Sequence, residues 1–295
     1  MKNKLYLFFL SLIFVGCTEP FNIKTNDSEP TIVIYGVLTD EFKQQSVQIT
    51  RSSPYFDNEP NPAISGAKVT IKSSDGKEFE LFEDTENAGN YLSKNNWSAQ
   101  SGINYTLNVD VDFKKNGTIN NYQASTLFAP TAFFDSLKIV PMMIMGHANY
   151  ALNVYGQDSE EEEFYLFRIT INDSLATTAL SQYILTDDIL FNGQYIDGLT
   201  MQYFDDISEW ENDSEEVRER STYIKYGDKI DVELSIITKG YYDFITQCVR
   251  EMGGENPMFG GPASNITTNI SNGGVGFFTG YCSSKVSATV ENSFP

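Results

Sequence analysis

Short runs in which apolar and polar residues alternate fill much of the chain from residue 31 onward, and this pattern predicts β-strands. The alternation is cleanest at Tyr105, Leu107, Val109 and Val111. A period of two places one face of a strand in the core and the other in water. In the first half of the chain, strands are expected at residues 31–38, 67–72, 105–111 and 122–128, and around Val47, Ile49, Phe79 and Leu81.

Turn signals separate these runs. They are Asp75-Gly76, Ala88-Gly89-Asn90, Ser101-Gly102 and Asn116-Gly117. About seven short strands at such spacing are typical of two antiparallel sheets packed face to face. We therefore expect a β-sandwich domain over residues 30–128.

The second half repeats the strand pattern after a hinge at Ala129-Pro130. One amphipathic helix is expected at residues 239–252, ended by Gly253-Gly254, and a polar one at residues 208–220. Residues 129–295 are thus expected to form a second β-rich domain with one or two short helices, although one sandwich with a large appended sheet also fits the pattern. Strands are expected at residues 137–145, 150–155, 164–171, 183–191, 230–236 and 277–290.

A segment rich in Gly, Asn, Pro and Ser interrupts this half at residues 251–276. Long irregular segments inside a domain are usually functional or mobile. One interpretation is that residues 256–276 carry a partner contact, with Met258 and Phe259 as apolar anchors and Phe277 and Phe278 at the edge. The other is that the segment folds over an open edge of the second sheet.

The N-terminus has a different pattern, in which Lys2 and Lys4 precede an apolar run at residues 5–15. The run is too short to span a bilayer, which needs about 20 residues, and is typical of a secretory signal peptide. Val15-Gly16-Cys17 resembles the bacterial lipobox, which implies removal of residues 1–16 and acylation of Cys17. Residues 17–29 are then a lipidated tether, whose last 12 residues can reach at most about 40 Å.

Composition narrows the classes of partner. The chain has 40 acidic and 20 basic residues, giving a formal charge of −20, and its pI is about 4.3. Nucleic-acid-binding proteins normally carry a basic patch and a high pI, so nucleic acid is not an expected partner.

Two of the three cysteines, Cys248 and Cys282, are left when Cys17 carries lipid. An even pair in an exported, oxidising compartment favours a disulfide. Two free buried thiols are the alternative.

Candidate chemistry is sparse. His147 is the only histidine and lies in a turn-like stretch, and neither a nucleophile elbow nor a zinc motif is present. No catalytic residue, metal or cofactor is therefore expected, and the acidic run at residues 158–163 is interpreted as a solvated surface. Ser136 and Ser174, each preceded by Asp and followed by Leu, match a short O-glycosylation acceptor of exported Bacteroidetes proteins; a turn followed by a strand start is the alternative.

Several longer motifs follow the lipobox in a characteristic order. They are CTEPF, TIVIYGVLTD, ITRSSPYFDN, SGAKVTIKSSDG, GNYLS before NYTLNVDV, and NPMFGGPASNITTNISNGGVGFFTGY. Together they resemble the lipoprotein family labelled domain of unknown function 4249, common in Bacteroidetes, over nearly the whole mature chain. The acidic run at residues 158–163 and the cysteine pair depart from that pattern.

The resemblance implies an immunoglobulin- or transthyretin-like sandwich in the first half and no enzyme activity. It also implies an outer-membrane location through the lipid anchor, at the cell surface rather than on the periplasmic face. Such proteins are often encoded beside a TonB-dependent transporter. We therefore expect an accessory subunit or ligand-presenting partner of such a transporter, or alternatively a free-standing glycan- or peptide-binding surface lipoprotein.

Overall fold

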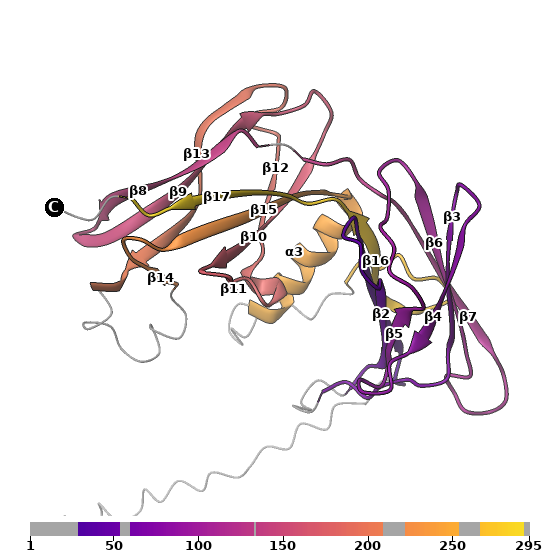
Figure 1. Cartoon of the computed structure of the whole chain (residues 1–295). Helices are drawn as coiled ribbons and strands as arrows, with labels where there is room; N and C mark the ends of the chain where they lie inside the picture. The colour runs from indigo at the N-terminus through magenta and orange to yellow at the C-terminus, as the bar shows by residue number, and fades with distance from the viewer. Residues whose placement is uncertain (1–28, 54–59, 133, 209–221, 254–265, 292–295) are drawn as a thin grey trace, which may run out of the picture.

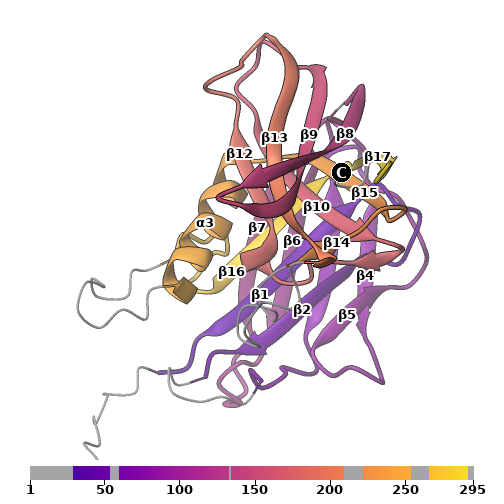
Figure 2. The same cartoon turned by 90° about the vertical axis from the view of Figure 1, so that its left-hand side faces the viewer.

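The computed structural model describes residues 29–53, 60–132, 134–208, 222–253 and 266–291 (Figure 1). Strands dominate these residues and form two β regions, with a helix in the angle between them (Figures 1 and 2). The expected mainly β class is confirmed.

The first region is an eight-stranded sheet with the order β16-β1-β2-β5-β4-β3-β6-β7. All neighbouring strands are antiparallel except β16 and β1, which run parallel. The strands are β1 (Ile32–Thr39), β2 (Ser46–Arg51), β3 (Lys68–Ser73), β4 (Glu78–Glu83), β5 (Asn90–Ser93), β6 (Asn104–Val111), β7 (Asn120–Leu127) and β16 (Val275–Tyr281).

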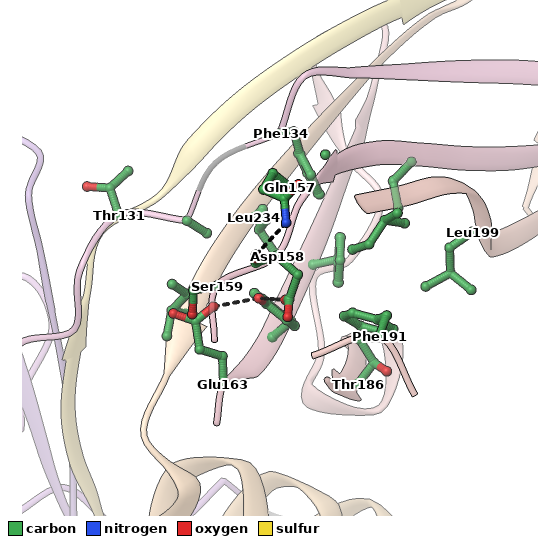
Figure 3. Close-up of a pocket in the computed structure, with 17 residues that line it drawn as sticks. Thr131, Phe134, Gln157, Asp158, Ser159, Glu163, Thr186, Phe191, Leu199 and Leu234 are labelled. Atoms are coloured by element: carbon green, nitrogen blue, oxygen red, sulfur yellow. Dashed lines mark hydrogen bonds between the residues drawn. The ribbon is translucent and has the colours of Figure 1, made fainter. Parts of the chain in front are cut away.

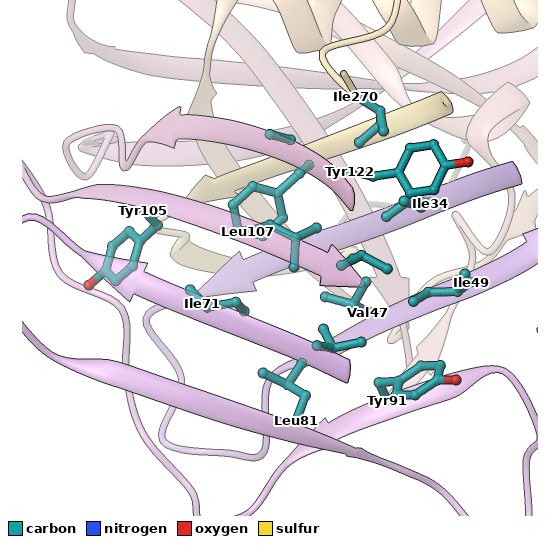
Figure 4. Close-up of a cluster of buried hydrophobic side chains, with 14 of the residues drawn as sticks. Ile34, Val47, Ile49, Ile71, Leu81, Tyr91, Tyr105, Leu107, Tyr122 and Ile270 are labelled. Carbon is teal, nitrogen blue, oxygen red and sulfur yellow. The ribbon is translucent and has the colours of Figure 1, made fainter. Parts of the chain in front are cut away.

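This sheet is folded over one hydrophobic core (Figure 4). Alternate residues of β1 and β6 are buried, as the period-two pattern predicted. Ile34 and Val47 from one side of the fold meet Ile71 and Leu107 from the other in the same cluster. Each such side chain contributes about 1.5–3 kcal/mol through burial, so this core is a main source of stability for the region.

The C-terminal part of the chain supplies one strand of this first sheet. The expected strand at residues 277–290 is in fact two strands, β16 and β17 (Ser284–Thr289), which lie in different sheets. β16 pairs with β1 from Val33↔Val275 to Thr39↔Tyr281. Residues 30–128 and 129–295 are therefore not separate sheets, because a strand from the second range completes the sheet of the first.

β16 also joins the two regions through its side chains. Phe278 is fully buried in the core of the first sheet, whereas Phe277, 3% exposed, packs on the opposite face against the helix. Successive residues of a strand point to opposite faces, which explains why neighbouring phenylalanines serve two cores. The expectation that Phe277 and Phe278 bind a partner is therefore wrong, since neither ring reaches the surface.

The described end of the Gly- and Asn-rich segment bridges β7 and β16. Asn269 pairs with the main chain of Phe278, donating from its amide at 2.7 Å and accepting at 2.9 Å. On the other side, the Ser271 amide donates to the Gln123 carbonyl at 2.8 Å. Ile270, 6% exposed, enters the core between them.

Residues 266–274 therefore cover part of the first sheet, and not an open edge of the second sheet as one interpretation of the sequence had it. Met258 and Phe259 lie outside the described residues.

The second region consists of two facing sheets that share one core. One sheet has the order β11-β10-β15-β17, with β12 also paired to β10, and the other has the order β14-β13-β9-β8. Their strands are β8 (Ser136–Ile144), β9 (His147–Gln157), β10 (Phe164–Ile171), β11 (Ser174–Leu175), β12 (Ile184–Asp187), β13 (Tyr195–Asp206), β14 (Tyr223–Ile224) and β15 (Lys229–Ile237), together with β17.

β13, at 12 residues, is the longest strand that sequence patterning missed; the short strands β5, β11 and β14 were also not expected. Its register against β9 shifts between Asp197 and Leu199 and again between Thr200 and Gln202. Each irregularity inserts a residue and moves the following side chains to the other face, so the strand has no sustained period of two. The strand expected at residues 183–191 is correspondingly short, because only Ile184–Asp187 pairs with β10.

The single α-helix of the described residues, α3 (Lys239–Gly253), closely matches the expected helix. Tyr241, Phe244 and Ile245 are buried against β10 and β16, in a third cluster that also contains Tyr281. A 3-10 turn, η1 (Leu180–Gln182), lies beside the helix. The second expected helix, at residues 208–220, lies outside the described residues except for residue 208.

The two cysteines are free thiols. Cys248 lies on α3 against the third cluster, whereas Cys282 is buried in the core of the first sheet. The predicted Cys248–Cys282 disulfide is therefore wrong, and the alternative of two free thiols holds. The chain separation of the cysteines gave no information on this point, because β16 carries Cys282 away from the helix into a different core.

Candidate functional site

A cavity of about 150 Å³ lies inside the second sandwich (Figure 3). Its walls come from both sheets, with Val154 on β9, Tyr165 and Phe167 on β10, and Leu234 on β15. Polar residues at the end of β9, in the loop between β9 and β10, and on β12 form another part of the lining. They are Gln157, Asp158, Ser159, Glu163 and Thr186.

Tyr165 is the centre of the polar part of this cavity. Its hydroxyl group is within hydrogen-bonding distance of two carboxylates, Asp158 and Glu163, the latter at 2.6 Å. Tyr165 and Asp158 are only 7% and 5% exposed. One phenolic proton therefore serves two acidic acceptors in a largely dry environment.

The environment keeps this hydroxyl group protonated. Burial, and then the hydrogen bonds and negative charges of Asp158 and Glu163, raise the pKa of Tyr165 well above its ordinary value of 10.0. A phenol with a raised pKa is a hydrogen-bond donor at neutral pH and a poor base or nucleophile. The role of Tyr165 that fits this geometry is therefore structural: its hydroxyl group donates a hydrogen bond that holds the carboxylates in place.

The carboxylates are also held by the main chain. Asp158 accepts a second hydrogen bond from the Gly193 amide at 2.9 Å. Asp188, 1% exposed, accepts from the Glu163 amide at 2.8 Å and so fixes the other side of the cluster. The expectation of a solvated acidic run at residues 158–163 is wrong for Asp158, because the loop that ends at Gly193 covers its carboxylate.

The size of the cavity limits what it can hold. Sites for small molecules usually occupy about 300–1,000 Å³. This cavity is smaller, and its buried carboxylates already accept hydrogen bonds from the protein. We therefore interpret the cluster as a structural hydrogen-bond network that holds β10 to the loops after β9 and β12.

Another buried carboxylate, that of Asp231, lies on β15 in the same sandwich. The hydroxyl group of Ser287 and then the ammonium groups of Lys229 and Lys285, each 3.0 Å away, lower its pKa to about 2 against the opposing effect of burial. Asp231 thus cross-links β15 to β17 through its contacts with Ser287 and Lys285.

The remaining predicted site residues lie apart from one another. Ser136 is half-buried at the start of β8, and Ser174 is exposed after a tight turn in which Asn172 and Asp173 have φ of 47° and 66°. His147 is exposed at the start of β9. The O-glycan acceptor role of Ser136 and Ser174 stays a prediction, and Cys17 lies outside the described residues.

The acidic pair Asp110 and Asp112 has a structural use. Asp112 accepts hydrogen bonds from the amides of Asn116 and Gly117 at 3.0 and 2.7 Å, which shapes the turn before β7. Asp110 accepts from the side-chain amide of Asn121 at 2.7 Å. Among the described residues, His, Cys, Asp and Glu side chains form no group of three or more that could hold a metal ion.

Within the described ranges, no helix is both long enough and apolar enough to cross a bilayer.

Comparison with known proteins gives one match over most of the chain. The model of the family described as domain of unknown function (DUF4249) matches residues 18–287. No curated protein matches the chain at a significant level.

Among solved structures, the chain is similar to the FN1-FN3 domains of chicken CNTN1, with 10% sequence identity and a TM-score of 0.26. The similarity covers 69% of this chain and 59% of that one.

Proposed function

The chain belongs to the DUF4249 family, and we propose that it is a non-enzymatic lipoprotein of the outer membrane that acts as an accessory subunit or ligand-presenting partner of a TonB-dependent transporter. In this proposal, acyl chains on Cys17 hold the protein at the cell surface. The folded body then contacts the transporter or its ligand.

The observation that carries the proposal is the continuity between the lipobox-like sequence and the family region. The family match begins at residue 18, directly after Cys17, and continues through both β regions to residue 287. Stable anchoring requires more than one acyl chain, which lipoprotein acylation would supply. A family region that begins directly after the proposed acylation site supports a folded body carried on that anchor.

Charge supports a partner that is a protein rather than the lipid surface. The formal charge of the whole chain is −20, and removing Lys2 and Lys4 with the leader makes it −22. An acidic body is repelled by anionic headgroups, so its own surface does not favour docking on the membrane. A tether of residues 17–29 lets such a body stand clear of the bilayer and reach a neighbouring protein.

The cavity supports surface recognition over enclosed chemistry. Its acidic groups are occupied by Tyr165 and main-chain amides, and its volume of about 150 Å³ suits a few waters rather than a nutrient. An accessory role needs no enclosed ligand site, because the contact surface can lie on strands or loops at the exterior.

The test is purification of the intact lipidated chain from outer membranes through a C-terminal tag, followed by identification of bound proteins. A TonB-dependent transporter should co-purify in near-stoichiometric amount. The matched control is Cys17→Ala, which removes the acylated residue but leaves the described body unchanged, and should lose both membrane retention and the transporter.

Recovery of the lipidated protein without any transporter would contradict the proposal. The free-standing alternative would then be favoured if the body, released from its anchor, binds a peptide or glycan alone. The open groove described next favours a peptide over a glycan.

A further inference from the structure

A groove with a volume of about 630 Å³ runs along one seam of the second sandwich, between strands β8 and β17. These strands are the outermost members of the two facing sheets and lie side by side (Figures 1 and 2). Among the described strands, β8 is paired only with β9, and β17 only with β15. The seam is therefore bordered by two strand edges.

The free edge of β8 is only partly able to accept another strand. Met145 and Gly146 form a two-residue turn with φ of 52° and 90°, so Ile144 and His147 are a hydrogen-bonded pair. Alternation along the ladder then directs the main-chain groups of Ile139 and Pro141 away from β9. Pro141 has no N–H, which blunts this edge as proline does in many edge strands.

The free edge of β17 keeps its donors. The Val290 amide donates to the Asp228 carbonyl at 2.9 Å, which sets the alternation of the β15–β17 ladder. Ser287 and Thr289 therefore direct their main-chain N–H and C=O groups away from β15, and both residues line the groove. An unpaired row of this kind is a template for an additional strand.

We propose that this groove is the partner contact of the protein, and that it binds an extended segment of the partner as an added β-strand along β17. The inference rests on the proposed function, for which it supplies the mode of contact. Main-chain hydrogen bonds to Ser287 and Thr289 would provide affinity, and the side chains of the groove would select the sequence.

The groove has a definite chemical character. Its apolar lining includes Leu137, Ile139 and Ala288, together with Val140, which is 40% exposed. Alternate apolar residues of an incoming strand would contact this lining while the others face water.

The charge of the groove is the second feature that would select the sequence of the partner segment. On the β17 side, Lys229 lines the groove, and it contacts the carboxylate of Asp231 together with Lys285. Lys138 adds a positive charge and Glu291 a negative one. The groove is thus locally positive within a chain of charge −20, and this complementarity favours a segment whose solvent-facing residues are acidic.

The experiment uses a defined probe, an acetylated peptide of about nine residues in which valine alternates with glutamate and threonine. Its binding to the folded chain is measured by fluorescence anisotropy. A second peptide carries N-methyl groups on alternate amides, which removes main-chain donors and keeps the side chains. We expect binding at least about tenfold weaker for the N-methyl peptide, and several-fold weaker when lysine replaces glutamate.

A pair of variants at Thr289 locates the site on the protein. Thr289→Pro removes one outward N–H of β17, and Thr289→Val keeps the N–H at nearly the same side-chain size. Because this N–H faces away from β15, the proline should leave the existing ladder in place. We expect at least fivefold weaker binding for Thr289→Pro and a change within about twofold for Thr289→Val, with melting temperature measured for both.

Each outcome decides the matter. Equal affinities for the two peptides, equal affinities for the two variants, or no binding at millimolar peptide would overturn strand addition. Self-association of the chain that Thr289→Pro abolishes would make a second copy the occupant and would overturn the partner assignment.

The two proposals fail differently. If the lipidated chain retains its transporter and Thr289→Pro retains it equally, the groove inference fails and the proposed function stands. If no transporter co-purifies with the unaltered chain, the proposed function fails whatever the peptide does.

Discussion

Replacing Tyr165 by Phe tests whether the polar cluster in the cavity is a structural hydrogen-bond network. The change removes only the hydroxyl group that serves Asp158 and Glu163 and keeps the ring, which packs against Phe167 and Phe191. Any loss of stability therefore reports the polar contacts rather than the core volume.

The expected loss follows from the hydrogen-bond inventory. A hydrogen bond to a charged group contributes about 1.5–3 kcal/mol, and Tyr165 has one proton to donate, so the two carboxylates cannot count as two full bonds. Asp158 keeps the Gly193 amide after the change. We expect Tyr165→Phe to lower the free energy of unfolding by about 2 kcal/mol, or the melting temperature by roughly 4–8 °C.

The assay is urea unfolding followed by circular dichroism at pH 7, together with capture of the transporter. Tyr203→Phe is the matched control, because Tyr203 is 48% exposed on β13, and it should change stability by less than about 0.5 kcal/mol. If Tyr165→Phe has normal stability but fails to capture the transporter, the interpretation is refuted and the cavity is a binding site.

Four further outcomes are expected. The intact mass of the membrane form should correspond to a chain that starts at Cys17 and carries added acyl mass, and an unmodified N-terminus elsewhere would contradict lipidation. Ile270→Ala should cost about 2–4 kcal/mol in urea unfolding, since it opens a hole where the segment closes the first sheet; a loss below about 1 kcal/mol would show that the closure is dispensable. The folded pKa of Asp231, about 2, lies below its unfolded value of about 3.9. The contribution of Asp231 to stability should therefore be complete above about pH 4 and lost as the pH falls toward 2. Asp231→Asn should remove that part of the acid dependence of unfolding. Thiol titration without reductant should find Cys248 and Cys282 both free on unfolding but slow to alkylate in the native state at pH 7, because burial raises the pKa of each thiol; absence of titratable thiol would restore the disulfide.

Local patterns were sufficient for most elements. The strands around Ile34, Leu107 and Val232 follow from alternation, and α3 follows from apolar spacing ended by glycine. These signals are local because the pleat of a strand and the turn of a helix are set within a few residues. β13 was missed for the same reason, since its two irregularities interrupt the local period.

Candidate site residues were predicted less well. Phe277 and Phe278 follow a glycine- and asparagine-rich segment, a context typical of exposed loops, yet both are buried because β16 has a core on each face. Asp158 begins an acidic run typical of a solvated surface, yet it is buried under Tyr165. In both cases burial depends on elements distant in sequence.

The sequence by itself was sufficient to predict the mainly β class, the positions of most strands and the family, and it contains the lipobox-like motif on which the proposal of lipidation rests. Each of these depends on neighbouring residues or on motif order. Only the tertiary structure decided that β16 pairs with β1, that Cys248 and Cys282 serve different cores, and that β8 and β17 leave an open seam. The physical reason is that strand pairing across long chain separations depends on which edges remain unpaired after the local hairpins form, and no short stretch of sequence contains that information.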